Sequence, residues 1–205
     1  MNWKFFSATL LLATSFAHAG ECVDKRDSQM LTLAYPAESA LVQPVDVQFQ
    51  LEGDTLFAQF DVRSDEINAK PVLGPKEYPY QGDVVELFIS VSDTTNPLPY
   101  YEFELSPFDD TFEVRVDSLR KAFAEGLHMG IQHHVERSDK GWQATLAIPL
   151  RNLGWKGDVS VIRGNAYSIL GKSPNRSYWS LYLPKQIKPN FHKPEFFRKL
   201  LCEEN

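Results

Sequence analysis

Glutamate side chains recur at alternate positions in the middle of the chain, between Tyr80 and Asp117. Three segments there alternate apolar and polar residues, and Asn-Pro and Ser-Pro pairs separate them. This period of two predicts an antiparallel meander with one buried face. The other face would carry five polar side chains: Glu86, Glu102, Glu104, Glu113 and Arg115. We expect Glu86, Glu104 and Arg115 to share a polar groove; a plain solvated sheet face is the alternative.

Aromatic and polar residues elsewhere could complete such a groove. Tyr80 ends a proline-bounded loop just before the first segment, and Trp179 follows a proline-containing turn. Flat rings with a polar edge can stack on the apolar C–H face of a pyranose. Carboxylate, amide and guanidinium groups can bind its hydroxyls in pairs. Candidate sugar-binding residues are Tyr80, Glu86, Glu104, Arg115, Asn175, Arg176 and Trp179. Trp179 also alternates with Leu181 and Leu183, so a core position is its alternative.

Neighbouring carboxylates on one face could also cleave a glycosidic bond, as an acid and a nucleophile. In open positions on a sheet, however, they would lack the apolar walls that raise the pKa of one of them. The sequence contains no nucleophile elbow, no His-Glu-x-x-His and no phosphate loop. We therefore expect no catalytic residues, and glycoside hydrolysis is the less favoured alternative.

Residues 1–19 have the pattern of an export signal. Lys4 precedes a short apolar run, and Ala17-His18-Ala19 is a small-x-small site, which predicts a secretory signal peptide cut after Ala19. The run is too short to span a bilayer. Residues 20–205 would then form a single secreted or periplasmic domain. Loss of Lys4 changes the net charge from −6 to −7, and an acidic chain without a basic cluster is not expected to bind nucleic acid.

The two cysteines lie near opposite ends of the expected mature chain, at Cys22 and Cys202. In an exported protein such a pair is expected to form a disulfide. Closing so long a loop would stabilise the fold by about 5 kcal/mol in the chain-entropy picture. Two separate free thiols are the alternative.

Short alternating segments joined by turns account for most of the remaining chain. Strands are expected at Leu31–Tyr35, Val45–Leu51, Thr55–Val62, the three central segments, His128–Glu136, Trp142–Ile148, Ser160–Leu170 and Ser177–Leu183. Ser118–Leu127 is expected to be a short helix or a loop, and Pro149–Gly154 a helical turn with proline at its start and glycine at its end. Pro194–Cys202 is expected to form a short C-terminal helix. The fold class is therefore all-β, an antiparallel β-sandwich of jelly-roll or immunoglobulin-like type with about ten strands.

An ordered series of residues gives the chain a resemblance to a known family. The series is Tyr80-x-Gly82-Asp83-x-Val85-Glu86-Leu87-Phe88, Tyr100-Tyr101-Glu102-Phe103-Glu104, Trp142, Ala147-Ile148-Pro149-Leu150, Arg163-Gly164-Asn165-x-Tyr167 and Trp179. It resembles the family-9 carbohydrate-binding modules, within the DOMON-like β-sandwiches, over nearly all of the mature chain. The resemblance implies non-catalytic binding of an oligo- or polysaccharide, with a sugar held between an early ring, here Tyr80, and a late one, here Trp179. Tyrosine replaces the usual tryptophan at the first position, and Arg176 replaces an amide.

The same resemblance implies two cofactor alternatives. DOMON-like sandwiches include cytochrome domains, for which the candidate haem ligands would be His128, Met129, His133 and His134. His133 and His134 would point to opposite faces of a strand, and no Cys-x-x-Cys-His attachment site exists. Family members often bind structural calcium, but beyond Asp109-Asp110 and Asp61–Asp65 the sequence has no compact acidic loop of the kind that calcium needs. No other cofactor is expected.

Overall fold

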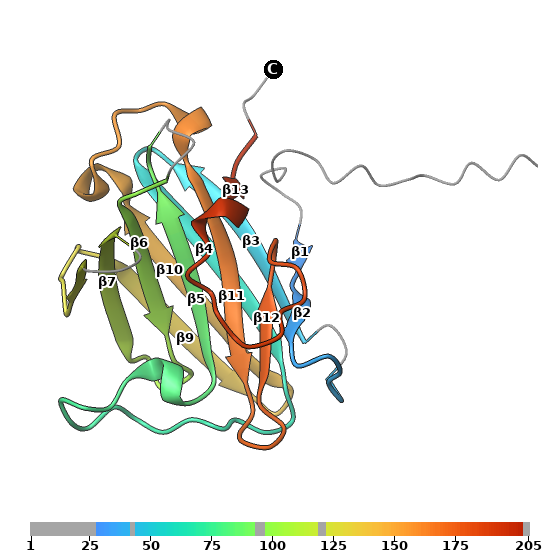
Figure 1. Cartoon of the computed structure of the whole chain (residues 1–205). Helices are drawn as coiled ribbons and strands as arrows, with labels where there is room; N and C mark the ends of the chain where they lie inside the picture. Colours follow the sequence, from blue (N-terminus) through green and yellow to red (C-terminus); the bar gives the residue numbers. More distant parts are fainter. Residues whose placement is uncertain (1–27, 42–43, 93–96, 119–121, 203–205) are drawn as a thin grey trace, which may run out of the picture.

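Two antiparallel β-sheets form the fold, as the computed structural model describes it for residues 28–41, 44–92, 97–118 and 122–202 (Figure 1). Within these residues the 5-stranded sheet has the order β1-β3-β4-β10-β9, and the 8-stranded sheet has β2-β12-β11-β5-β6-β7-β8 with β13 also paired to β11. The expected β-sandwich is confirmed. The expected signal peptide and Cys22 lie outside the described residues.

The strands are short, and consecutive groups of them belong to one sheet or the other. The 5-stranded sheet contains β1 (Gln29–Met30), β3 (Val45–Glu52), β4 (Thr55–Arg63), β9 (Gln132–Ser138) and β10 (Gly141–Pro149). The 8-stranded sheet contains β2 (Thr32–Tyr35), β5 (Val84–Ser90), β6 (Tyr100–Leu105), β7 (Thr111–Ser118), β8 (Ala122–Glu125), β11 (Arg163–Leu170), β12 (Ser177–Ser180) and β13 (Arg198–Lys199). The described helices are single 3-10 turns: η1 (Pro79–Gln81), η2 (Leu150–Leu153), η3 (Val159–Val161) and η4 (Pro194–Phe196).

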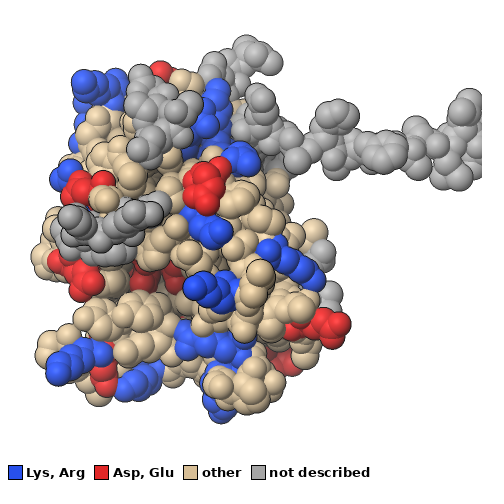
Figure 2. Space-filling model, viewed as in Figure 1, with Lys and Arg blue, Asp and Glu red and all other residues tan. Residues whose placement is uncertain are grey.

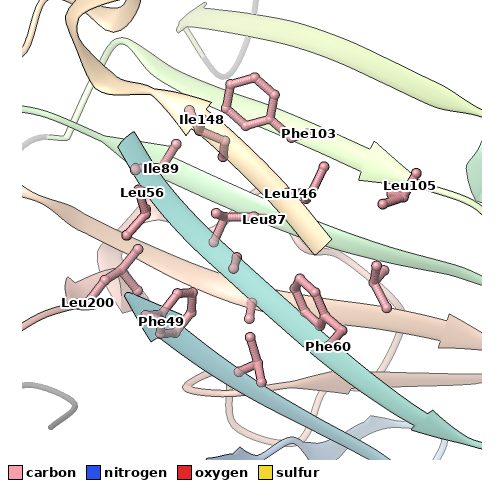
Figure 3. Close-up of a cluster of buried hydrophobic side chains, with 14 of the residues drawn as sticks. Phe49, Leu56, Phe60, Leu87, Ile89, Phe103, Leu105, Leu146, Ile148 and Leu200 are labelled. Atoms are coloured by element: carbon pink, nitrogen blue, oxygen red, sulfur yellow. The ribbon is translucent and has the colours of Figure 1, made fainter. Parts of the chain in front are cut away.

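Alternating apolar side chains from both sheets fill the space between them (Figure 3). Leu87 and Ile89 of β5 meet Phe60 of β4 and Leu146 of β10, and all four are fully buried. Burial of each such side chain stabilises the folded chain by about 1.5–3 kcal/mol, because its apolar surface is removed from water. This layer is the main core and fixes which residues of each strand face outward.

A second apolar layer lies on the outer face of the 8-stranded sheet. Residues 184–197 cross this face in front of β11 and β12 (Figure 1). The Tyr167 ring stacks on Phe191 with centroids 4.3 Å apart, and its hydroxyl donates to the Phe191 carbonyl at 3.1 Å. Phe88 and Tyr100 belong to the same buried cluster. The sheet is therefore apolar on both faces where this segment covers it.

Two expected elements are wrong. Pro194–Cys202 is not a helix, because the chain leaves η4 and pairs with β11 through β13. Phe197 enters the outer apolar layer, whereas Leu200 enters the main core. The segment Ser118–Leu127 is neither helix nor loop alone, because β8 pairs with β7 as a further strand. The helical turn at η2 is confirmed, with Gly154 in the left-handed region at φ 91°.

None of the described helices combines the length and the apolar character that a membrane span requires.

Candidate functional site

A cleft of about 680 Å³ opens on the outer face of the 8-stranded sheet, beside residues 184–197. The side chains that line it come from η1, from β5 to β8, from β11, from the turn before β12 and β12 itself, and from residues 189–192. Figure 2 views this face and shows acidic side chains recessed below neutral ones. Its lining residues are Tyr80, Gln81, Glu86, Phe88, Glu102, Glu104, Phe112, Val114, Glu125, Ile169, Arg176, Tyr178, Pro189, Asn190, Phe191 and His192.

Three glutamates form the floor of the cleft. Glu86 on β5 lies directly opposite Glu104 on β6, and Glu102 points to the same side two residues earlier, as strand alternation requires. Only 3% of Glu86, 6% of Glu102 and 1% of Glu104 is exposed. This burial contradicts the expectation of open carboxylates without apolar walls.

Burial decides the ionisation of these glutamates. Removal from water raises the pKa of Glu102 to about 7. The pKa values of Glu86 and Glu104 lie well above the usual range for the same reason, and the neighbouring carboxyls raise them further. The floor therefore holds protons at neutral pH and can both donate and accept hydrogen bonds.

The polar partners of the floor differ from one glutamate to the next. The Glu104 Oε2 accepts a hydrogen bond from the backbone N–H of Tyr80 at 3.0 Å. The Glu102 Oε2 lies 4.0 Å from Nε2 of His192. His192 is itself bonded through Nδ1 to the Tyr100 hydroxyl at 2.7 Å. The protein thus fixes Glu104 directly and places an imidazole beside Glu102.

Aromatic rings stand on two sides of this floor. Tyr80, with 40% of its surface exposed, stacks on Tyr78 at 5.1 Å and meets Phe112 edge-on at 6.3 Å. Tyr178 on β12 and Phe191 pack edge-on at 5.8 Å. β12 and β7 are four strand steps apart in the sheet, roughly 19 Å. The carboxylates on β5 and β6 therefore lie between the two groups of rings.

Arg176 joins the two sides. Its guanidinium donates to the backbone carbonyls of Tyr80 and Gln81, the latter at 2.9 Å. It also lies 5.7 Å from the centroid of the Tyr178 ring. Because these hydrogen bonds are directed at the backbone of η1, Arg176 positions η1 and the Tyr80 ring above the floor.

The loop that leads to Tyr80 is also tied from below. The buried carboxylate of Asp83 accepts hydrogen bonds from the backbone N–H of Asn68 at 2.7 Å and from that of Gly171 at 2.6 Å. At Gly82 a Cβ atom would lie 2.8 Å from the Cα of Ala69, so glycine permits this close approach. These contacts hold η1 at one position over the sheet.

Four predicted site residues line the cleft together: Tyr80, Glu86, Glu104 and Arg176. Trp179 does not. It faces the main core with 3% of its surface exposed, and its indole N–H donates to the Ser177 hydroxyl at 2.9 Å. Its strand partner is Ser168, which in turn pairs with Val85 on the core side of β5. The clamp expected between Tyr80 and Trp179 is therefore wrong.

Arg115 was expected in the groove, but it lies on the opposite face of β7. Its pairing partner is Tyr101, whereas Glu104 pairs with Phe112. The Arg115 guanidinium instead meets the carboxylate of Asp117 at 2.7 Å, with both side chains nearly half exposed. Phe112 and Val114 occupy the cleft side of this strand, so the alternation of β7 is shifted by one residue from the expected phase.

Asn175 also lies away from the cleft. It is exposed in a turn that its backbone N–H closes on the Lys172 carbonyl at 2.8 Å. It lines a separate hollow of about 390 Å³ with Pro174 and Ser177. The turn thus presents Arg176, but not Asn175, to the cleft.

The candidate haem ligands lie on or before β9, at the edge of the 5-stranded sheet. His133 pairs with Asp109 at 2.9 Å and His134 with Glu136 at 3.1 Å. His128 and Met129 lie on the loop before this strand. None of these four residues is among the described residues that line the cleft. Within the same part of the chain no group of three or more histidine, cysteine or acidic side chains is arranged to hold a metal ion.

Several cleft residues were not proposed from the sequence as sugar ligands. The alternation did place Glu102 on the face of Glu104, and it places Tyr178 on the face opposite to Trp179. The sequence pattern could therefore have identified these two residues as facing the cleft. Phe191 and His192 belong to a segment without regular structure. Their position depends on contacts with Tyr167 and Tyr100, which no local pattern encodes.

Comparison with known proteins identifies the architecture. No protein-family model matches the chain, and no curated protein matches it. A protein assigned as carbohydrate-binding from Bacteroides uniformis has a TM-score of 0.68, with 16% identity and 86% of each chain covered. A family-9 carbohydrate-binding module from Caldicellulosiruptor kristjanssonii has a TM-score of 0.58, in complex with cellotriose (13% identity, 87% of this chain, 84% of the module) and with glucose (12% identity, 87% of this chain, 85% of the module). The chain therefore shares its fold with carbohydrate-binding proteins that include family-9 modules, which confirms the expected resemblance at the level of the fold.

Proposed function

We propose that this chain binds carbohydrate non-covalently in the cleft above β5 and β6 and catalyses no reaction. The observation that carries the proposal is a cleft of about 680 Å³ with aromatic rings on two sides and buried carboxyl groups between them. The fold shared with carbohydrate-binding modules supports it independently.

The residues of the cleft suit the two kinds of surface on a sugar. The half-exposed Tyr80 ring offers a flat apolar face for pyranose C–H groups. Below it, protonated carboxyls such as that of Glu102 can donate a hydrogen bond to a sugar hydroxyl and can also accept one through their carbonyl oxygens. Since Arg176 and Glu104 already fix the position of Tyr80, little freedom is lost on binding.

Glycoside hydrolysis requires a different set of pKa values. A carboxyl pair that cleaves a glycosidic bond needs one ionised member and one protonated member. Here burial raises the pKa of Glu86, Glu102 and Glu104, so none of the three has the ordinary low pKa of a carboxylate nucleophile. Incubation with aryl glycosides should therefore release no phenol; measurable turnover that Glu102→Gln abolishes would contradict the non-catalytic proposal.

We also propose that residues 1–19 direct export and that residues 20–205 act as a single domain outside the cytoplasm, where polysaccharides are accessible. Sequencing of the protein recovered after export should give Gly20 as the first residue. A mature protein that still begins at Met1 would refute this.

The binding proposal is tested with a glycan array of the mature domain, followed by titration calorimetry with the sugars that it retains. Tyr80→Ala should weaken binding about tenfold, because the exposed ring face would no longer be covered by the sugar. Phe57→Ala is the matched control, since Phe57 is a partly exposed ring on the 5-stranded sheet. No retained glycan, or equal losses in both variants, would refute the proposed site.

A further inference from the structure

The carboxyl group of Glu86 has no hydrogen-bond partner among the described residues. It lines the cleft, and only 3% of the residue is exposed. The charged groups that act on it are Glu102, which repels it, and Arg176, which attracts it from a distance. Its oxygens are not among the fully buried atoms that lack a partner, so they open onto the cleft. No group of the described residues satisfies them, and they can therefore accept from a donor that enters the cleft.

The surroundings of Glu86 carry an excess of acidic groups. Glu102 and Glu104 lie beside it on β6, and Glu125 stands at the exposed rim. Two basic side chains line the same cleft. Arg176 donates to the carbonyls of η1, and burial lowers the pKa of His192, which favours its neutral form. A cation in the cleft would therefore meet more acceptors than competing charges.

We propose that the cleft selects a sugar that carries a free amino group, with its ammonium held by Glu86 and the adjoining carboxylates. This inference rests on the proposed carbohydrate-binding function. An ammonium has three donors and no acceptor. Its positive charge favours ionisation of the adjoining carboxyls, which release their protons to solvent as it binds and then only accept hydrogen bonds. It also relieves the repulsion among the three buried acids, whereas a neutral hydroxyl does not.

The same arrangement disfavours related sugars. An N-acetyl group removes the positive charge, so it cannot form the charge-assisted hydrogen bonds that an ammonium makes to Glu86. Uronic acids and sulfated sugars add negative charge to a floor that already holds three acids. The volume of about 680 Å³ is within the range of sites for small ligands. Amino, hydroxyl and acetamido versions of one oligosaccharide should therefore bind with clearly different affinities.

Calorimetry of the mature domain with three oligosaccharides tests the inference: a trimer of β-1,4-linked glucosamine, cellotriose and N,N′,N″-triacetylchitotriose. They share the linkage and ring stereochemistry and differ at position 2. At pH 6.5 the glucosamine trimer should bind about tenfold more tightly than cellotriose, the difference between a charge-assisted and a neutral hydrogen bond. The acetylated trimer should bind more weakly than the glucosamine trimer by at least the same factor.

Glu86→Gln should abolish the preference, so that the affinity ratio of the glucosamine trimer to cellotriose falls to near one. Glu136→Gln is the matched control, because it removes one exposed carboxylate on the 5-stranded sheet, and it should keep the ratio at about ten. Circular dichroism confirms folding, and Glu102→Gln replaces Glu86→Gln if that variant does not fold. Cellotriose binding equal to or tighter than glucosamine-trimer binding would overturn this inference but leave carbohydrate binding standing, whereas absence of binding to any glycan would overturn both.

Discussion

Replacement of Trp179 by alanine tests whether this residue belongs to the core or to the binding site. Trp179 is 97% buried between the sheets, and β12, the strand that carries it, contains only four residues. Truncation of a buried tryptophan costs about 3–5 kcal/mol through lost transfer energy and the cavity that remains. Loss of the hydrogen bond from the indole N–H to Ser177 places the expected value in the upper half of this range, about 4 kcal/mol.

In a domain of this size each kcal/mol lowers the melting temperature by about 2–4 °C, so Trp179→Ala should melt about 8–16 °C below the parent. Differential scanning calorimetry measures the shift, and glycan titration is done on the same samples well below both transitions. Tyr80→Ala is the comparison, because its ring is 40% exposed and should lose binding with little change in melting temperature. If Trp179→Ala melted within 3 °C of the parent and lost glycan binding, the core position derived from the strand register would be refuted.

Three further perturbations test other parts of the structure. Because the folded pKa of Glu102, about 7, exceeds the unfolded value, its protonation stabilises the fold at low pH and this stability is lost as pH rises through 7. Between pH 4 and 8 the free energy of unfolding from urea titrations should fall by about 3 kcal/mol less in Glu102→Gln than in the parent. Equal pH dependence in the two proteins would contradict the shifted pKa. Arg176→Lys should weaken glycan binding about tenfold, because an ammonium cannot hold the Tyr80 and Gln81 carbonyls in the same geometry; unchanged affinity would exclude its positioning role. Thiol titration of the unfolded, unreduced protein should find no free thiol if Cys22 and Cys202 are joined, and two titrating thiols would exclude the bridge.

Period-two alternation was sufficient to locate most strands and part of the site. It placed Glu86 and Glu104 on one face of β5 and β6, as the register confirms. The same alternation puts Trp142 on the side of Ala144 and Leu146, and this side faces the core, where 2% of the Trp142 surface is exposed. These strands lie in the middle of their sheets, where one face is covered by the other sheet and polar residues mark the other face.

The same rule failed on β7 because both of its faces depart from the simple pattern. On the cleft side Phe112 and Val114 contact the rings and the outer apolar layer. On the other side Arg115 is nearly half exposed, so this part of the strand is not sealed by the 5-stranded sheet. An alternation rule that assigns apolar residues to the core therefore selects the wrong phase, and a shift of one residue exchanges the faces completely.

The C-terminal segment misled helix prediction for a related reason. Phe196, Phe197, Leu200 and Leu201 have the spacing of an apolar helical stripe. In the structure Phe197 packs on the outer layer, while Leu200 packs in the main core and its N–H donates to the Ile162 carbonyl at 3.1 Å. A segment at a sheet edge can divide its apolar residues between two cores, and local spacing does not distinguish this from one helix face.

The cleft follows from the way in which the outer layer ends. Residues 184–197 cover the apolar side chains of β11 and β12. Phe191 and His192 form the edge of this cover, and beside them the sheet faces the open cleft. At that border a sheet that needed only solubility could carry exposed lysine or glutamate side chains. It carries instead three nearly buried glutamates, of which Glu86 has no hydrogen-bond partner among the described residues. Because removal of a carboxyl from water without a partner in the protein destabilises the folded chain, the position of Glu86 is better explained by a donor that enters the cleft than by the stability of the sheet.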